Sequence, residues 1–475
     1  MKIKLFILSL ILIFTASTLT GCSFGVGGGG TSVKIEPVEL TIWGLFDSSD
    51  AFNKMITAYR ATRPHVKIHY YKIRWEDYEQ KLIESWASDT GPDIFMIHNT
   101  WMDGYTDKIY PLSDKLTLPV ISSTGVLKKE EKIIDKEFGA LRPQELRNIF
   151  PDVVYSDVVR SNEEKINQIY GLPLSIDTLG LFYNRTHFNA AGILTPPRTW
   201  EELTEVVKKL TLTDASGEFI RSGIALGGAD NINRSNDILS LLMLQNGTTM
   251  TDTLNRISFN QASIHDSQFY PGEQALRFYT DFALPSKEVY SWNKDLTEAT
   301  ELFAAGKLSM MFGFPYQIST LQTQAPKIDF GIAPTLHINE DGTDALGLPV
   351  NLASYWLYTP FKRTEHPDEA WNFILSITTQ QYKTEEGAPR FYAQDYLDAT
   401  GRPPALKSLI NEFKQNYPEF SPFADQLLTA QNWYHGANAN NMNTIFKQMI
   451  NNVILGKTDI KSAINFAASA ISHSY

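Results

Sequence analysis

The chain has 475 residues, of which 43% are hydrophobic and 20% charged, and its formal net charge is −11 at pH 7. This length can bury one large core or form two domains, and the composition is that of a folded protein rather than a disordered one. The acidic balance disfavours nucleic acid as a partner, because binding it requires a basic surface.

The beginning of the chain has the pattern of a lipoprotein signal peptide, predicted for residues 1–21. Two lysines precede an apolar stretch, 5–14, which is far shorter than the roughly 20 residues that a membrane-spanning helix needs. Gly21 then precedes Cys22, the only cysteine, and this ending resembles the site where bacterial lipoproteins are cleaved and lipid-modified. We therefore expect an extracytoplasmic protein, anchored to a cell membrane through Cys22 by a lipidated, glycine-rich tether, 22–37.

The residues after the tether alternate between strand and helix patterns. Apolar residues at helical spacing mark the helices, and runs rich in β-branched and aromatic residues mark the strands. In order, these are a strand at 39–46, a helix that Ser48 or Ser49 can cap, a strand at 66–73, a helix at 75–88 and a strand at 94–97. This alternation predicts a parallel sheet with helices on its faces.

Polar and aromatic residues follow two of these strands, at the edge where a parallel α/β sheet binds its ligands. Asp47 lies in the loop after the first strand, and the loop after the third strand holds three further candidates, Asn99, Trp101 and Asp103. Both loops should face the same crevice, because the carboxyl ends of parallel strands share one edge. For Trp101 the alternative is simple packing beneath its own loop.

The segment 112–168 is polar and uneven, and no chemistry can be assigned to it. The mixed charges of 128–136 predict a solvated helix face. The stretch 142–159 predicts a pair of helices that is interrupted near Pro151.

The stretch 169–184 is the point around which the chain is organised. Gly171 and Pro173 interrupt regular structure, and a mostly apolar run with the pattern of a buried strand follows. Asp177 lies inside this run, and a buried carboxylate requires a partner, a cavity or a ligand. We interpret the region near 174–178 as a crossing from one lobe to another; the alternative is a core strand whose aspartate caps a neighbouring helix.

Beyond this crossing, Thr199 and Glu202 have the spacing of a capping box at the start of a helix. A strand is predicted at 222–226. The polar loop that follows it, 227–236, carries Asn231 near its tip as another ligand candidate.

The last third of the chain contains two further crossing candidates. A strand at 308–312 leads to Tyr316, and the apolar run 347–357, with Asn351 inside it, has the pattern of a return to the first lobe. A third crossing is suggested near 401–404. Two helices are predicted to close the chain, at 442–453 and 460–471.

Four segments, in this order along the chain, resemble the family of extracellular solute-binding proteins that serve ABC importers, in the sugar-binding branch related to maltose-binding protein. The segments are Gly91-Pro92-Asp93-Ile94-Phe95, Tyr170-Gly171-Leu172-Pro173, Leu181-Phe182-Tyr183-Asn184 with its continuation at 197–203, and 303–311. The resemblance runs from about residue 38 to the C-terminus.

The resemblance implies an α/β, two-lobed periplasmic-binding-protein-like fold (type II), in which each lobe is a mostly parallel sheet flanked by helices and crossover segments join the lobes. Lobe one would comprise 38–175 plus 347–408, and lobe two 176–346 plus 409–475. A sugar or oligosaccharide would be trapped between the lobes by hinge closure and delivered to a membrane permease. The protein would be a monomer without enzymatic activity, cofactor or metal.

The resemblance also implies roles for several residues. Asp47 matches the acidic position after the first strand, Asp177 matches the crossover carboxylate that bonds sugar hydroxyls, and Tyr316 lies where the family has a stacking aromatic. Trp101 and Asp103 lie in the loop after the third strand. The aromatic expected in the penultimate helix is replaced by a stretch around 441–443, where upstream Trp433 or His435 could substitute, which leaves the particular sugar open.

Three other interpretations stay open at this point. Asp47, Asp103 and Asp177 could instead surround a polyamine or another charged solute. A lipid-anchored glycosidase would need two carboxylates roughly 5–9.5 Å apart, which 53 acidic residues do not exclude. An adhesion or chaperone module would need no pocket at all.

Overall fold

The computed structural model describes residues 33–124, 130–252, 254, 256–345, 347–434, 436 and 439–472. The predicted signal peptide, Cys22 and most of the tether lie outside these residues, as does His435. The larger of two compact units comprises 36–119 and the chain from 135 onward. No helix within the described residues combines the length and apolarity needed to cross a membrane.

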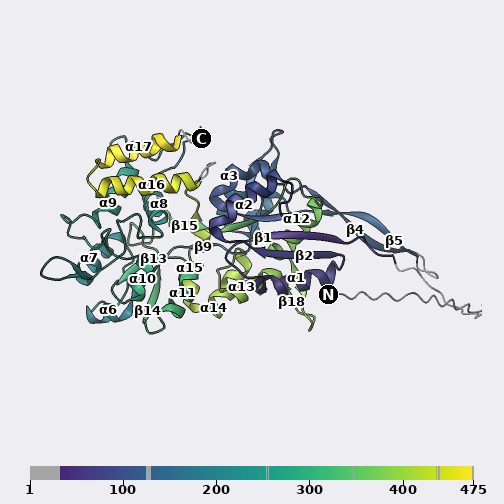
Figure 1. The fold of residues 1–475 in the computed structure, drawn as a ribbon, viewed down its shortest axis with the longest axis horizontal. Helices are drawn as coiled ribbons and strands as arrows, with labels where there is room; N and C mark the ends of the chain where they lie inside the picture. Colours follow the sequence, from purple (N-terminus) through teal and green to yellow (C-terminus); the bar gives the residue numbers. More distant parts are fainter. Residues whose placement is uncertain are drawn as a thin grey trace, which may run out of the picture. The chain divides into compact units, whose positions relative to one another are not determined.

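The first sheet confirms the predicted alternation of strand and helix (Figure 1). Its strand order is β2-β1-β3-β16-β8, in which β1 is parallel to β2 and β3, while β16 is antiparallel to β3 and β8. The elements are β1 (Val38–Gly44), α1 (Asp50–Thr62), β2 (Val66–Lys72), α2 (Trp75–Ala87), β3 (Ile94–His98), β8 (Leu172–Pro173), β16 (Trp356–Pro360), α12 (Pro367–Thr379) and α13 (Tyr392–Thr400). Ser49 holds the N-cap position of α1, but its side chain makes no capping bond.

The second sheet corrects one expectation, because its central strand runs against its neighbours. β10 (Gly180–Asn184) is antiparallel to both β13 (Met310–Gly313) and β14 (Phe330–Pro334). The chain enters this lobe through β10, whereas β13 and β14 both return in the opposite direction and are joined by α11 (Tyr316–Gln324). Both strand pairs of this sheet are therefore antiparallel, rather than mostly parallel as expected. Of the strand predicted at 222–226, only Ser222 forms a bridge, parallel to Leu308.

Helices surround the second sheet. The predicted capping box is half formed: the Thr199 hydroxyl accepts from the Glu202 amide at 3.1 Å, whereas the Glu202 carboxylate accepts from the amide of Arg198. The helices are α6 (Arg185–Ala190), α7 (Trp200–Leu210), α8 (Ser235–Gln245), α9 (Pro271–Asp281), α10 (Ala299–Ala304), α16 (Ala439–Ile454) and α17 (Ile460–Ser472).

Short strands join the two lobes. In β9 (Asp177–Thr178) and β15 (Asn351–Ser354), Asp177 pairs with Ser354 and Thr178 with Ala353, in antiparallel register. On its other side β15 is parallel to β19 (Ala430–Gln431). The segment 401–404 joins this group through a bridge between Ser175 and Pro404. The chain segments that pass between the lobes thus lie side by side.

The segment 112–168 differs from the expectation. The run 128–136, predicted to be helical, belongs where described to β5 (Glu130–Gly139), which forms a two-stranded sheet with β4 (Lys115–Thr124). A ribbon exposed along β5 has no buried face and hence no alternation of polar and apolar residues, so charge alone could not separate strand from helix. The helix pair predicted around Pro151 is confirmed as α4 (Pro143–Ile149) and α5 (Asp152–Val158).

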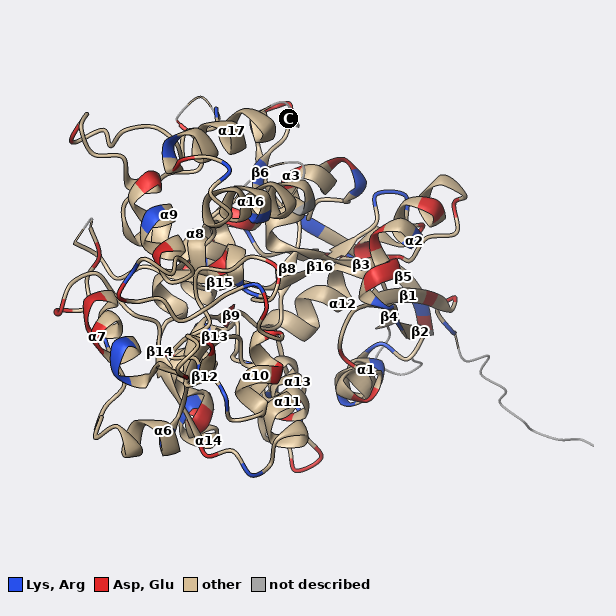
Figure 2. Ribbon diagram, turned by 60° about the vertical axis from the view of Figure 1, so that its left-hand side comes forward, with Lys and Arg blue, Asp and Glu red and all other residues tan. Residues whose placement is uncertain are grey.

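The remaining elements are short. They are η1 (Asn99–Trp101), α3 (Met102–Tyr105), η2 (Thr106–Lys108), β6 (Val159–Ser161), β7 (Asn167–Ile169), β11 (Leu212–Thr213), β12 (Phe219–Arg221), β17 (Gln381–Lys383), β18 (Pro389–Phe391), η3 (Lys407–Leu409), α14 (Ile410–Asn416), η4 (Pro418–Phe420), α15 (Ser421–Ala424) and η5 (Leu427–Thr429). Figure 2 shows acidic and basic positions scattered over the ribbon, with both signs present in each part of the view.

A buried carboxylate ties the first lobe to the crossing segments. Asp157 of α5 is fully buried and accepts hydrogen bonds from Asn99 Nδ2 at 3.0 Å, Tyr355 OH at 2.6 Å and Asn432 Nδ2 at 3.0 Å. These donors come from η1, from the link between β15 and β16 and from the segment after β19. One side chain therefore holds three chain segments together.

We predict that Asp157→Ala lowers the free energy of unfolding by about 2–5 kcal/mol, because three buried donors lose their acceptor. The measurement is urea-induced unfolding. Asp152→Ala is the matched control on the same helix: that side chain is 68% exposed, so its loss should cost less than about 1 kcal/mol. Equal effects of the two substitutions would contradict the proposed role of Asp157.

Candidate functional site

Four aromatic side chains gather at the carboxyl edge of the first sheet. Phe46 follows β1, Trp75 follows β2, Trp101 follows β3, and Trp356 begins β16 beside the end of β3, where it pairs with His98. The Trp75 and Trp356 rings lie 5.6 Å apart at 84°, and the Trp101 ring lies 5.8 Å from Trp75 and 5.5 Å from Trp356. The parallel register of β1, β2 and β3 brings these residues together at the edge that the sequence analysis identified.

Exposure divides this aromatic group into a base and a surface. Trp101 is only 6% exposed and supports the other rings from beneath, as in the packing alternative, whereas Trp75 is 46% and Phe46 44% exposed. Phe46 has a φ of 58°, a conformation that is unfavourable for a bulky residue and has to be held by its surroundings. The edge thus presents flat apolar surfaces that a folded protein ordinarily buries.

Beside the aromatic group, one arginine joins two of the predicted carboxylates. Arg402 Nη2 lies 3.2 Å from Asp47 Oδ1, and its Nη1 lies 3.9 Å from Asp177 Oδ2. Tyr396 OH donates to the second oxygen of Asp47 at 2.9 Å. The second oxygen of Asp177, Oδ1, is buried and has no hydrogen-bond partner among the described residues. It is thus an acceptor without a protein donor.

Burial raises the pKa of the Asp177 carboxyl, Arg402 opposes this rise, and the nearby charge of Asp47 adds to it. A buried acceptor left unpaired costs free energy that a ligand hydroxyl could recover. This is the property that the sequence analysis sought at the crossing, and it favours a ligand site over a helix cap.

His98 links the end of β3 to the crossing strand β15. Its Nδ1 lies 2.8 Å from the Thr100 hydroxyl and its Nε2 lies 3.0 Å from Ser354 Oγ, and the ring tautomer decides which partner donates in each hydrogen bond. Burial, together with the positive charge of Arg234, lowers the pKa of His98 to about 3. His98 is therefore neutral at physiological pH and positions the residue that pairs with Asp177.

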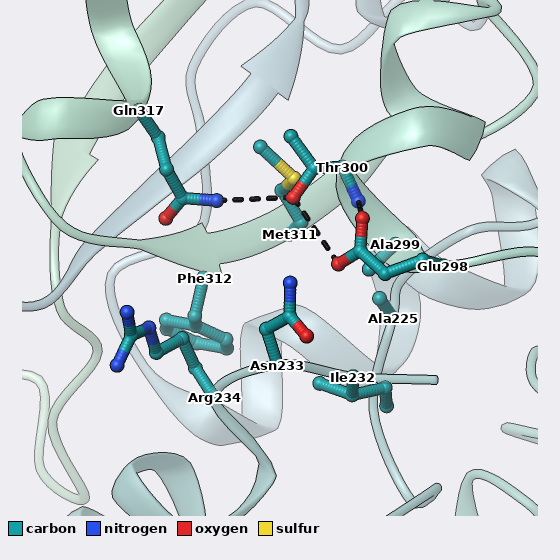
Figure 3. A pocket seen from close by; sticks show the side chains of 10 residues that line it. All are labelled: Ala225, Ile232, Asn233, Arg234, Glu298, Ala299, Thr300, Met311, Phe312 and Gln317. Carbon is teal, nitrogen blue, oxygen red and sulfur yellow. Dashed lines mark hydrogen bonds between the residues drawn. The ribbon is translucent and has the colours of Figure 1, made fainter. Parts of the chain in front are cut away.

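The second lobe contributes a small pocket (Figure 3). It contains about 230 Å³ of empty space, counting the part open to solvent, and is lined by Ala225, Ile232, Asn233, Arg234, Glu298, Ala299, Thr300, Met311, Phe312 and Gln317. Gln317 donates to the Thr300 hydroxyl, which in turn donates to Glu298, each at 3.2 Å. The amide of Asn233 lies among the lining side chains and makes no bond to those drawn in Figure 3.

Arg234 connects this pocket to the crossing. Its guanidinium lies 4.8 Å from the centre of the Phe314 ring, and its Nη2 donates to Tyr316 OH at 2.6 Å. Its charge acts on the pKa of both His98 and Asp177, so the side chain lies near them. Tyr316, the predicted stacking residue, is 40% exposed and held by this arginine.

Five of the predicted ligand contacts have partners within the protein instead. The Asn99 amide is committed to Asp157, and Asp103 forms an ion pair with Arg160 at 2.6 Å. These bonds hold the Asn99 and Asp103 side chains within the protein, so we leave both residues out of the candidate site.

Asn231 donates to the carbonyls of Asn293 and Leu296 and accepts from Trp292, which fixes the conformation of the loop 227–236. Asn351 lies between the hydroxyls of Thr335 and Thr429. Trp433 packs in the second lobe with ring centres 6.4 Å from Phe259 and 6.2 Å from Phe446. Asn and Trp side chains in such patterns serve loops and cores as readily as ligands, and sequence alone does not separate these roles.

Sequence reasoning missed five residues of the site. They are Trp75, His98, Arg234, Trp356 and Arg402. Trp75 directly follows the second predicted strand, so the rule that selected the loops after the first and third strands would have found it. Arg402 lies within the third predicted crossing, and Arg234 within the same polar loop as Asn231. The carboxylates beside Arg402 and the aromatic rings beside Arg234 are distant in sequence, so the sequence does not mark these two arginines as site residues.

Comparison with known proteins decides the family. The sequence profile of the bacterial extracellular solute-binding proteins matches residues 45–383, well over half of the chain. The chain belongs to this family. A protein of Brucella abortus (strain 2308) that is named as a binding protein is 22% identical over 338 residues, which cover 70% of each chain.

Solved structures of this kind share the fold. The cyclic α-maltosyl-1,6-maltose binding protein of Arthrobacter globiformis is 20% identical, with a TM-score of 0.66 over 92% of this chain and 98% of that one. A solute-binding protein of an ABC transporter from Thermotoga lettingae, solved with α-D-tagatose, is 17% identical, with a TM-score of 0.63 over 92% and 99%. This solute-binding protein therefore has the two-lobed type II fold.

We predict a pH signature for His98. Because its folded pKa of about 3 is below the ordinary 6.5, the unfolded chain binds more protons between these values, and stability falls as the pH falls. Its contribution between pH 7.5 and 5.5 should be about 1.4 kcal/mol, and His98→Gln should remove it.

The measurement is the free energy of unfolding in urea at both pH values. The control is His69→Gln, because the His69 side chain is 43% exposed. The prediction fails if His98→Gln and the wild type lose equal stability on acidification.

Proposed function

We propose that this protein is the extracytoplasmic binding component of an ABC importer and captures a sugar or oligosaccharide between its lobes. The observation that carries the proposal is the unpaired Asp177 carboxylate oxygen, together with the exposed rings of Trp75 and Phe46. The strand of Asp177 is linked through Ser354 and His98 to the aromatic group. Sugars combine apolar C–H faces, which pack on aromatic rings, with hydroxyls that need fixed polar partners. The sugars bound by the Arthrobacter and Thermotoga proteins support this assignment.

We infer that capture proceeds by closure about the crossing strands β9 and β15. The aromatic group belongs to the first lobe and the pocket beside Asn233 to the second, while Asp177 lies on the strand between them. A solute that contacts both lobes only in the closed state shifts the equilibrium toward closure by its extra affinity for that state. The lobe boundaries near 175, 347 and 408 follow this assignment, and the closed form would deliver the solute to the permease.

A neutral solute fits the charges better than a polyamine. Asp47 and Asp177 share Arg402, and Asp103 is paired with Arg160, so each acid considered for cation binding has an arginine beside it. The glycosidase alternative is not favoured, because the family is one of solute-binding proteins. We retain Cys22 as the proposed lipid anchor and a monomer as the proposed state, with no role for nucleic acid.

The decisive experiment is a thermal-shift panel of neutral sugars, oligosaccharides, polyamines and peptides on the purified protein. A ligand at 100 times its Kd stabilises the folded state by about 2.7 kcal/mol, which raises Tm measurably. We expect stabilisation by a sugar. Stabilisation by polyamines alone, or hydrolysis of an oligosaccharide, would reject the proposal.

We predict that Trp75→Ala weakens sugar binding by about tenfold, because a stacking face worth about 1–2 kcal/mol is lost. The variant should stay folded, since the side chain is nearly half exposed. Titration calorimetry with the sugar found in the panel measures the effect. Phe466→Ala is the control: Phe466 is 62% exposed on α17 and should leave affinity unchanged.

A further inference from the structure

We propose that Arg402 determines the charge selectivity of the site, because it lowers the affinity for cationic amino sugars relative to their neutral analogues. This inference rests on the function proposed above, because it specifies the class of solute that the same site takes. It assigns a role to a residue of the third crossing segment, which neither the sequence pattern nor the family assignment identifies.

The geometry leaves Arg402 as the link between the two carboxylates. The side chains of Arg402, Asp47 and Asp177 are 15%, 11% and 14% exposed, so water screens them little. Within the described residues, Arg402 is the cation within ion-pair distance of either carboxylate. The local charge of the three groups together is −1 with Arg402 present and −2 without it.

Arg234, the other cation whose charge acts on Asp177, cannot replace Arg402 in this role. It comes from the second lobe, where it contacts Tyr316 and lies 3.4 Å from Asp237. It influences the pKa of Asp177 through space but forms no ion pair with it in the described structure. Removing Arg402 would therefore leave the two largely buried carboxylates of Asp47 and Asp177 without a paired cation, which is an arrangement that binds ammonium groups.

The position of the unpaired Asp177 oxygen explains how Arg402 acts on a bound solute. A solute that bonds this oxygen approaches the guanidinium on the same carboxylate, 3.9 Å from its other oxygen. The affinity for a neutral hydroxyl depends little on the local charge. The attraction of an ammonium to the two carboxylates, by contrast, is weakened by the guanidinium in a poorly screened site. A sugar hydroxyl and an amino group at the same ring position are thereby distinguished by charge rather than by shape.

The test compares matched neutral and amino sugars on one set of variants. Dissociation constants are measured by calorimetry for glucose and glucosamine, galactose and galactosamine, and for putrescine as a simple dication. For Arg402→Gln we expect the preference for the amino member over the neutral member to rise at least tenfold, and putrescine binding to appear. Arg402→Lys keeps the charge and should restore the wild-type preference.

A second variant should change the preference for amino sugars in the opposite direction, and its result does not depend on whether Arg402→Gln folds. Asp47→Asn removes one negative charge and leaves Arg402 in place, so the preference for amino sugars should fall below that of the wild type. Arg160→Gln removes an arginine of the first lobe whose partner is Asp103, and it should leave the preference unchanged.

A purely structural role of Arg402 predicts a different pattern. Affinities for neutral and amino sugars would then fall by the same factor in Arg402→Gln, and Asp47→Asn would not change their ratio; either result overturns the inference. If no sugar bound any variant, the proposed function would fail, but the appearance or absence of putrescine binding in Arg402→Gln would still decide the role of Arg402.

Discussion

The pairing of two short crossing strands is the constraint on which the rest of the site depends. In β9 and β15, Asp177 lies opposite Ser354, and the Ser354 hydroxyl is hydrogen-bonded to His98 at the end of β3. A shift of this register by one residue would turn Asp177 to the other side of the strand and away from Arg402. The strands that join the lobes thus also place the polar group nearest to the proposed ligand.

This arrangement explains why buried charges are tolerated at a crossing. A lone carboxylate there would be costly, but Arg402 compensates Asp47 and partly compensates Asp177. The compensation is incomplete by one hydrogen bond, since Asp177 Oδ1 stays unpaired in the described structure. A ligand that donates a hydrogen bond to Asp177 stabilises the state in which it is bound. If that state is the closed one, the binding energy shifts the equilibrium toward closure.

The sequence predicted what depends on local patterns and missed what depends on long-range charge pairing. The strands and helices of the first sheet and the helix pair at Pro151 follow from periodicity and from Gly and Pro positions. The direction of β10 and the partner of Asp47 do not, because Arg402 lies hundreds of residues away in the chain. Strand β5 was missed because it is exposed along its length and carries no hydrophobic period.

The aromatic group shows the same division between local and distant information. Trp101 was selected because it follows a strand, yet Trp75 and Trp356 cover it, so it supports the surface instead of forming it. A tryptophan pair at nearly a right angle leaves a corner rather than a flat platform. Because the base is rigid and the exposed rings are held by it, little side-chain entropy remains to be lost on binding. Such preorganisation lets weak C–H contacts with the aromatic rings contribute to affinity. The polar groups at the crossing then determine which solutes bind.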